Sequence, residues 1–153
     1  TITAASSSKI SDGAAAVVLA SEAEVARLGL TPLAWISGYT THSQEPEWFT
    51  TAPGPAINRL REQLGWAAED VDLYEVNEAF AVVAMAAMAD CGIPHEKINI
   101  WGGACALGHP IGATGARIVV TLLNALRQTG GKRGIASLCI GGGEGTALAV
   151  ELA

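Results

Sequence analysis

One residue after Cys139 the chain has three consecutive glycines, and a thiol close to a bare backbone could support proton-transfer chemistry. A thiol has a reference pKa of about 8.5, close enough to neutrality to give and take a proton. Glycines let a substrate approach the backbone closely, and free N–H groups in such a loop can hold a developing oxyanion. The alternative is a small core cysteine beside a tight glycine hairpin.

Two further polar residues, His109 and Asn77, each have a chemical and a structural interpretation. His109 lies in a glycine-rich loop, where a neutral imidazole could activate a thiol or donate to an oxyanion. It could also simply hydrogen-bond loop carbonyl groups, the commoner case for a lone histidine. Asn77 precedes an apolar helical stretch and could be a plain N-cap, with Glu78 favouring the positive end of that helix.

The elements that must position these residues follow from apolar patterns. We expect strands over 13–20, 33–41, 71–76, 98–101, 134–140 and 146–152. We expect helices over 22–28, from about 57 to 64, over 78–90 and up to about 127. The helix over 78–90 is apolar on all sides, which is typical of a helix packed inside a protein. This alternation predicts a three-layer α/β domain with a mixed sheet, whose ligands bind beyond the carboxyl ends of strands.

Composition limits the classes of function. Half of the 153 residues are hydrophobic and 16% are charged, which excludes a disordered chain and indicates that a partner subunit or missing domain covers part of the surface. A net charge of −6 without a long basic run argues against a nucleic-acid partner. No apolar run approaches the roughly 20 residues that span a bilayer, so we expect no membrane association. Three scattered cysteines without a signal peptide favour a cytoplasmic location.

Three motifs stand in an order and at spacings that resemble the thiolase family: NEAF at 77–80, GGACALGHPIGATGAR at 102–117 and CIGGG at 139–143. The segment over 5–15 resembles the start of that family's carboxyl-terminal domain. The resemblance implies an α/β, three-layer thiolase-like domain with a mixed five-stranded sheet between helices. It also implies that residues 1–153 form the carboxyl-terminal domain, as a fragment or processed product without the amino-terminal half that holds the nucleophilic cysteine.

The resemblance implies a role for each polar motif. Cys139 matches the acid/base cysteine that moves the α-proton of acetyl-CoA. His109 matches the histidine that activates the nucleophilic cysteine and contributes to an oxyanion hole, and Asn77 matches the residue that holds a water completing this hole. The N–H of Gly141 matches one donor of a second oxyanion hole.

Two positions are implied to bind substrate. Ser8 matches a serine that contacts the pantetheine part of CoA, and Phe80 matches an apolar wall of the same tunnel. Two departures from the family pattern accompany them: Lys9 stands where a glycine is expected, and residues 49–53 replace a Met-Gly-containing loop that shapes the acyl pocket in short-chain members. The sequence therefore leaves the acyl chain length open.

The implied function is that of an acyltransferase making or cleaving 3-ketoacyl-CoA by Claisen chemistry in fatty acid metabolism, with ping-pong kinetics. The implied partners are CoA or acyl-CoA, the amino-terminal half and further copies in a homo-oligomer. We expect no separate cofactor and no metal, because the histidines lack ligand spacing. We expect the isolated chain to be inactive and poorly soluble or self-associating. The alternative is a non-catalytic thiolase-like protein that binds acyl-CoA or assists assembly, although the coincidence of Asn77, His109 and Cys139 argues against it.

Overall fold

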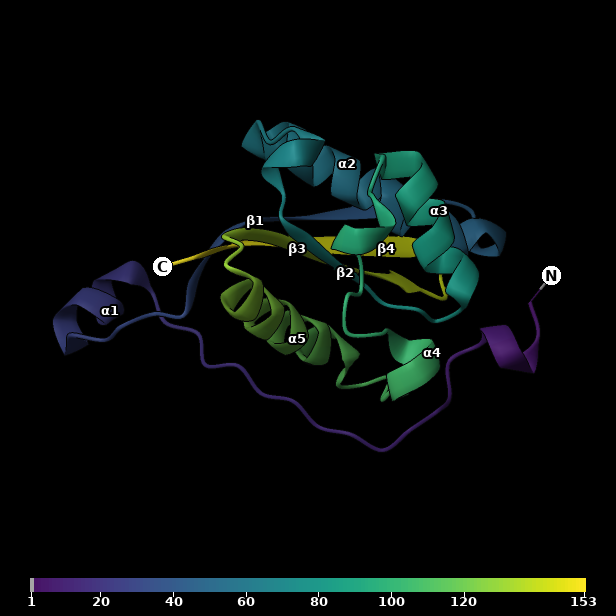
Figure 1. Cartoon of the computed structure of the whole chain (residues 1–153), viewed down its shortest axis with the longest axis horizontal. Helices are drawn as coiled ribbons and strands as arrows, with labels where there is room; N and C mark the ends of the chain where they lie inside the picture. The colour runs from purple at the N-terminus through teal and green to yellow at the C-terminus, as the bar shows by residue number, and fades with distance from the viewer. Residues whose placement is uncertain (1) are drawn as a thin grey trace.

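A computed structural model describes residues 2–153, and its centre is a four-stranded mixed sheet (Figure 1). The sheet order is β1-β4-β3-β2, from β1 (Ala34–Ser43), β2 (Leu73–Val76), β3 (Arg133–Ile140) and β4 (Glu144–Leu152). β2 and β3 are parallel, whereas β4 is antiparallel to both of its neighbours. The predicted mixed sheet is confirmed, but the predicted number of five strands is wrong.

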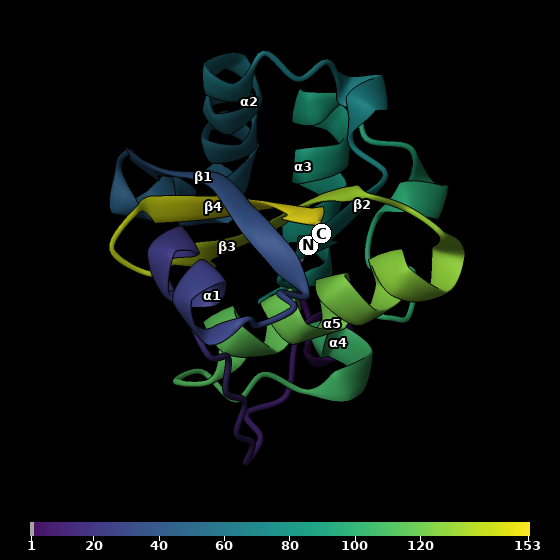
Figure 2. The same ribbon diagram turned by 90° about the vertical axis from the view of Figure 1, so that its left-hand side faces the viewer.

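Helices cover both faces of the sheet, which confirms the predicted three layers (Figure 2). One face carries α2 (Pro53–Leu64) and α3 (Ala81–Cys91), and the other carries α5 (Thr114–Thr129) with the short α4 (Ala104–Leu107) beside it. The predicted helix α1 (Glu22–Leu28) is confirmed but has no buried residue. Short 3₁₀ turns occupy Ala4–Ser6, Pro46–Thr51, Ala68–Asp70 and His95–Lys97. Within residues 2–153, no helix has both the length and the apolar character to cross a membrane.

Neighbouring residues of β2 point to opposite layers, because side chains alternate along a strand. Tyr74 and Val76 belong to the core beneath α2 and α3, whereas Leu73 belongs to the core beneath α5. Glu75 shares the face of Leu73, and Asn77 continues it just beyond the strand end. The strand therefore directs two polar side chains toward α5.

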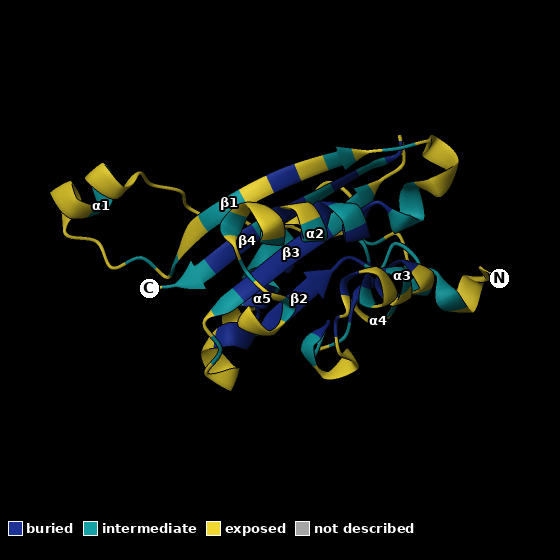
Figure 3. Ribbon diagram, turned by 90° about the horizontal axis from the view of Figure 1, so that it is seen from above, coloured by how far each residue is buried: buried dark blue, intermediate teal, exposed yellow. Residues whose placement is uncertain are grey.

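Residues 13–20, predicted to form a buried strand, have no regular structure and are largely exposed (Figure 3). Val18 and Leu19 are 98% and 72% exposed. An apolar, β-branched run indicates that a segment prefers a buried strand, but the run does not supply the neighbouring strand that must pair with it. No strand within residues 2–153 pairs with this segment.

The predicted strand over 98–101 is also wrong, and Asn99 explains why. A single backbone bridge joins Ile98 to Tyr74, after which Asn99 adopts a φ of 46° and turns the chain away. Asn99 Oδ1 accepts a hydrogen bond from the Val76 N–H at 2.8 Å, and Asn99 Nδ2 donates to the Val76 carbonyl at 2.8 Å. The side-chain amide of Asn99 thus makes hydrogen bonds at the edge of β2 that a fifth strand would have made.

The helix predicted over 78–90 begins three residues later, because Phe80 is extended, with φ −137° and ψ 152°. Asn77 is therefore not an N-cap; it is 2% exposed at the end of β2. The intervening residues are held by the amino-terminal segment, since the Ser8 N–H donates to the Ala79 carbonyl at 3.1 Å. This pairing comes from a distant part of the chain and overrides the local helical pattern.

Asn99→Ala should lower the free energy of unfolding by about 2–4 kcal/mol, because both polar groups of Val76 lose their partner inside the protein. The left-handed backbone at position 99 adds strain for alanine. Asn124→Ala is the matched control, since Asn124 is exposed on α5 and its substitution should change stability by less than about 0.5 kcal/mol. Urea unfolding of the three proteins measures both effects. Equal losses would show that Asn99 does not hold the sheet edge.

Candidate active site

A cleft of about 540 Å³ lies where the carboxyl ends of β2 and β3 meet the amino-terminal segment. The cleft is lined mostly by apolar side chains. Five of the six predicted site residues line it: Ser8, Phe80, His109, Cys139 and Gly141. The sixth, Asn77, is buried at the adjoining end of β2. Among residues 2–153, no group of three His, Cys, Asp or Glu side chains is placed to hold a metal ion.

His109 is held by hydrogen bonds from both its backbone and its ring. Its N–H donates to the Lys9 carbonyl at 2.8 Å, and its Nδ1 lies 2.7 Å from Thr114 Oγ1. Thr114 Oγ1 donates its own proton to the Pro110 carbonyl at 3.0 Å, so it must accept from the ring. Nδ1 therefore carries the imidazole proton, and Nε2 keeps a free lone pair. Burial, together with the positive charge of Arg117, lowers the pKa of His109 and keeps the ring neutral at neutral pH.

Cys139 lies near the end of β3, half-buried against the core beneath α2 and α3. Burial raises the pKa of the Cys139 thiol, so the protonated form is present at neutral pH. Gly141 follows in the β3–β4 turn, where an added Cβ would meet no atom within 4 Å. The cleft therefore joins a proton-bearing thiol to a backbone that a ligand can approach closely.

Ser8 and Phe80 form one wall of the cleft. Ser8 Oγ donates to the Ala79 carbonyl at 2.9 Å, so its hydroxyl fastens the amino-terminal segment to the end of β2. The Phe80 ring meets that of Phe49 edge to face, with centroids 6.2 Å apart. The wall is apolar at Phe80, while the contacts of Ser8 and Phe80 with a ligand stay predictions.

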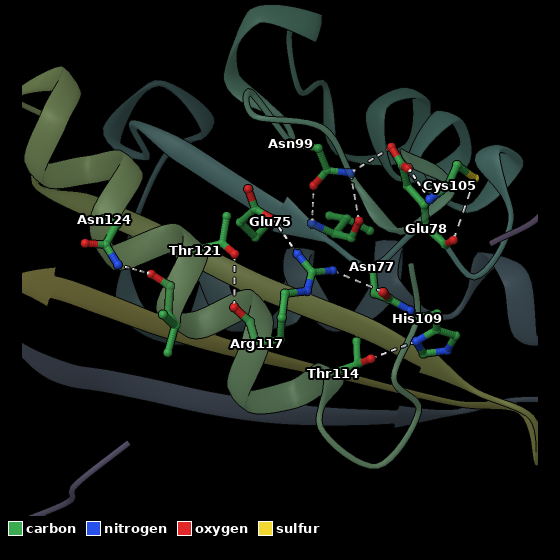
Figure 4. Close-up of polar contacts among 12 residues, drawn as sticks. Glu75, Asn77, Glu78, Asn99, Cys105, His109, Thr114, Arg117, Thr121 and Asn124 are labelled. Carbon is green, nitrogen blue, oxygen red and sulfur yellow. Dashed lines mark hydrogen bonds and ion pairs between the residues drawn. The ribbon is translucent and has the colours of Figure 1, made fainter. Parts of the chain in front are cut away.

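Glu78 joins two of the sequence motifs to each other (Figure 4). Its Oε2 accepts from the Cys105 N–H at 3.1 Å, and its Oε1 accepts from Asn99 Nδ2 at 3.2 Å. Gly103 leaves the space for this contact, because an added Cβ there would overlap the Glu78 carboxylate. Glu78 thus binds the segment that leads to His109. The sequence had suggested instead that Glu78 favours the positive end of the following helix.

Sequence reasoning missed a buried polar group behind the cleft. Arg117 Nη1 lies 3.6 Å from Glu75 Oε2, and Arg117 Nη2 donates to Asn77 Oδ1 at 3.5 Å. Burial raises the pKa of Glu75 to about 7; Arg117 opposes this rise and Glu78 adds to it. Two signals were present: a glutamate within an apolar strand, and an arginine three residues after Thr114 in a predicted helix.

Gly103→Ala should displace Glu78 from the Cys105 N–H and lower the free energy of unfolding by about 1–3 kcal/mol, since a charge-assisted hydrogen bond is lost. Gly112→Ala is the matched control, because an added Cβ there would meet nothing within 4 Å. Chemical unfolding of both variants gives the comparison. A Gly103→Ala protein as stable as the Gly112→Ala protein would contradict this account of the motif contact.

Glu75→Gln should change how stability depends on pH. The pKa of Glu75 is raised in the folded state, to about 7 from an ordinary 4.5, so the folded state binds more protons between these values. Its contribution to stability is therefore full below about pH 4.5 and is lost as the pH rises to about 7, with a size on the order of 3 kcal/mol. The variant should flatten this part of the curve, whereas Glu96→Gln, at an exposed position, should not. Urea unfolding across this range decides; parallel curves for the native and Glu75→Gln proteins would refute the assignment.

Comparison with known proteins identifies the family. Residues 30–152 match the family described as "Thiolase, C-terminal domain". The chain is 51% identical over 151 residues to the cytosolic acetyl-CoA acetyltransferase of Mus musculus, covering 99% of this chain and 38% of that relative. It superposes on the Bacillus anthracis acetyl-CoA acetyltransferase with a TM-score of 0.96 and 45% identity, covering 99% of this chain and 39% of that one.

A second solved structure, human mitochondrial 3-ketoacyl-CoA thiolase in complex with CoA, superposes with a TM-score of 0.91 and 40% identity. That superposition covers 99% of this chain and 39% of the human one. The chain thus spans less than half the length of the proteins that it matches. The sequence match and the superpositions agree, and the chain belongs to the thiolase family, in which it corresponds to the C-terminal domain.

Proposed function

We propose that this chain is the part of an acetyl-CoA C-acyltransferase that supplies proton transfer and oxyanion binding for the making or cleavage of 3-ketoacyl-CoA. The observation that carries the proposal is the meeting of Cys139, His109 and the open backbone of Gly141 in one cleft. The names of the mouse and Bacillus anthracis relatives and the CoA complex of the human relative support it.

In the proposed reaction, the neutral His109 begins as a base. Its Nε2 lone pair takes the proton of a nucleophilic thiol supplied by the amino-terminal half, and the thiolate then attacks the acyl carbonyl. The resulting imidazolium can donate to the oxygen of an enolate, together with a water held by Asn77. The Gly141 N–H donates to the oxyanion that forms as the acyl-enzyme is made or broken.

Cys139 carries the second proton transfer. In the cleavage direction, its thiol gives a proton to the α-carbon of the acetyl-CoA enolate, and the resulting thiolate takes the proton of the incoming CoA thiol, which attacks the acyl-enzyme. In the synthetic direction, the thiol first gives its proton to the CoA thiolate that leaves as the acyl-enzyme forms. The Cys139 thiolate then removes the α-proton of acetyl-CoA, and the enolate attacks the acyl-enzyme. General acid–base steps of this kind contribute about 10²–10⁴-fold to rate.

Exposed apolar side chains support association with the amino-terminal half. Val82 and Met85 on α3 are 41% and 64% exposed, so α3 is not enclosed on all sides within this chain, contrary to its sequence pattern. The segment over 13–20 is exposed as well. We expect a helix that is apolar on all sides, and an exposed apolar segment, to be buried against another part of the protein. We further propose that the parent protein is cytoplasmic, as is the mouse relative by name, and that it acts in fatty acid metabolism as a homo-oligomer.

A chimera tests the proposed function. It joins the amino-terminal part of the Bacillus anthracis enzyme, up to the start of the superposed region, to residues 1–153. We expect this protein to cleave acetoacetyl-CoA in the presence of CoA, and Cys139→Ala to reduce kcat by about 10²–10⁴-fold. Cys91→Ala is the matched control, because Cys91 is buried at the end of α3 and should leave kcat unchanged once the protein is folded.

Two outcomes would reject the proposal. One is a folded chimera without turnover; the other is a Cys139→Ala chimera as active as the native one. Titration calorimetry with acetyl-CoA tests the non-catalytic alternative. Binding of acetyl-CoA by a folded but inactive chimera would favour the non-catalytic acyl-CoA-binding alternative.

A further inference from the structure

We propose that Arg117 is a positioning residue, which orients the side-chain amide of Asn77 so that its NH₂ group faces the cleft. The inference rests on the proposed function, because that function uses Asn77 as a hydrogen-bond donor to the water of the oxyanion hole. Arg117 itself does not line the cleft. It acts through Asn77.

Two elements bring these residues together. The alternation along β2 directs Glu75 and Asn77 toward α5, as described above. On the first turns of α5, Thr114 and Arg117 are three residues apart and therefore share a helix face. Through Thr114 this helix end holds His109, and through Arg117 it holds Asn77 (Figure 4).

The chemistry of the guanidinium selects one orientation of the amide. Arginine has only donors, so its contact with Asn77 must involve Oδ1, and the distance of 3.5 Å from Nη2 agrees. The amide nitrogen then lies on the other side, and Figure 4 shows it directed toward His109. A flipped amide would set Nδ2 against the guanidinium and turn Oδ1 toward the cleft. A carbonyl oxygen there would repel the negative charge that the site must stabilise.

The burial of this group favours a role in the site over a role in stability. The side chains of Arg117 and Glu75 are only 17% and 3% exposed. Arg117 Nε and Nη1 are buried without a hydrogen-bond partner within residues 2–153. A buried ion pair with unfilled donors contributes little to stability, and an apolar pair of similar volume is often as stable or more so. Glu75 is the acidic group that faces the arginine, with its Oε2 3.6 Å from Nη1.

Arg117→Lys in the active chimera tests the inference. Lysine keeps the positive charge beside Glu75, but its compact ammonium lacks the planar fork that reaches both partners. We expect kcat to fall about ten- to a hundredfold, with little change in KM, as for weakening of an oxyanion-hole donor. Arg127→Lys is the matched control, since Arg127 is exposed on the last turn of the same helix. It should leave both constants unchanged.

A double-mutant cycle separates positioning from general structure. In an Asn77→Ala background, Arg117→Lys should cost almost no further activity, because the amide that it orients is gone. An equal fractional loss in both backgrounds would overturn the inference, as would a loss that appears only in KM. A thermal unfolding curve of each variant shows whether it is folded at the assay temperature, and only folded variants are compared.

A measurement without turnover keeps the inference testable if the proposed function fails. A flip of the Asn77 amide about its Cβ–Cγ bond carries the Nδ2 protons away from the His109 ring (Figure 4), and nuclear Overhauser contacts between these groups in the selectively labelled chimera follow this change. We expect weaker contacts in Arg117→Lys than in the native and Arg127→Lys proteins. Unchanged contacts would reject the positioning role. An inactive chimera that still shows this difference would refute the proposed function alone.

Discussion

The side-chain amide of Asn99 makes the contacts on which the cleft depends. It closes the edge of β2 by binding both polar groups of Val76, and it also donates to Glu78. Glu78 in turn binds the Cys105 N–H in α4, the short helix that precedes His109. A chain of hydrogen bonds thus runs from the end of the sheet to the imidazole-bearing loop. A true fifth strand would satisfy β2 but would provide no side chain to continue this connection.

The other side of the cleft depends on the alternation of β2. Glu75 and Asn77 fall on the face that α5 covers. The first turns of α5 therefore contact two predicted site residues, Asn77 through Arg117 and His109 through Thr114. Desolvating Glu75 costs stability, and Arg117 recovers only part of that cost across a distance of 3.6 Å. A strand position filled by leucine or valine would pack more favourably beneath the helix. The pair of Glu75 and Arg117 is therefore better explained by the proposed positioning of Asn77 through Arg117 than by the energy it contributes.

Sequence patterns predicted the elements whose causes are local. The amphipathic face of α2 and the glycine that ends it were read directly, and so were β1, β3, β4 and α1. The predictions failed where contacts with a distant segment determine the local structure. The run over 13–20 lacks a neighbouring strand, and Phe80 is kept extended by a segment some seventy residues earlier in the chain. Four residues of the cleft belong to the three sequence motifs, and Ser8 was named from the resemblance of the opening segment. The pairing of Glu75 with Arg117, in contrast, required knowing how α5 sits on the sheet.

The protonation states of the cleft fit the reaction proposed for it. Cys139 and His109 are both neutral at rest, so the two groups proposed to move protons carry no net charge before the reaction begins. Charge develops only once a proton moves, and the transition state then carries an oxyanion that the ground state lacks. Burial, together with the positive charge of Arg117 behind the site, lowers the pKa of His109 and keeps the imidazole neutral. The same charge disfavours the imidazolium, so the protonated His109 of the proposed reaction is a strong donor to the enolate oxygen.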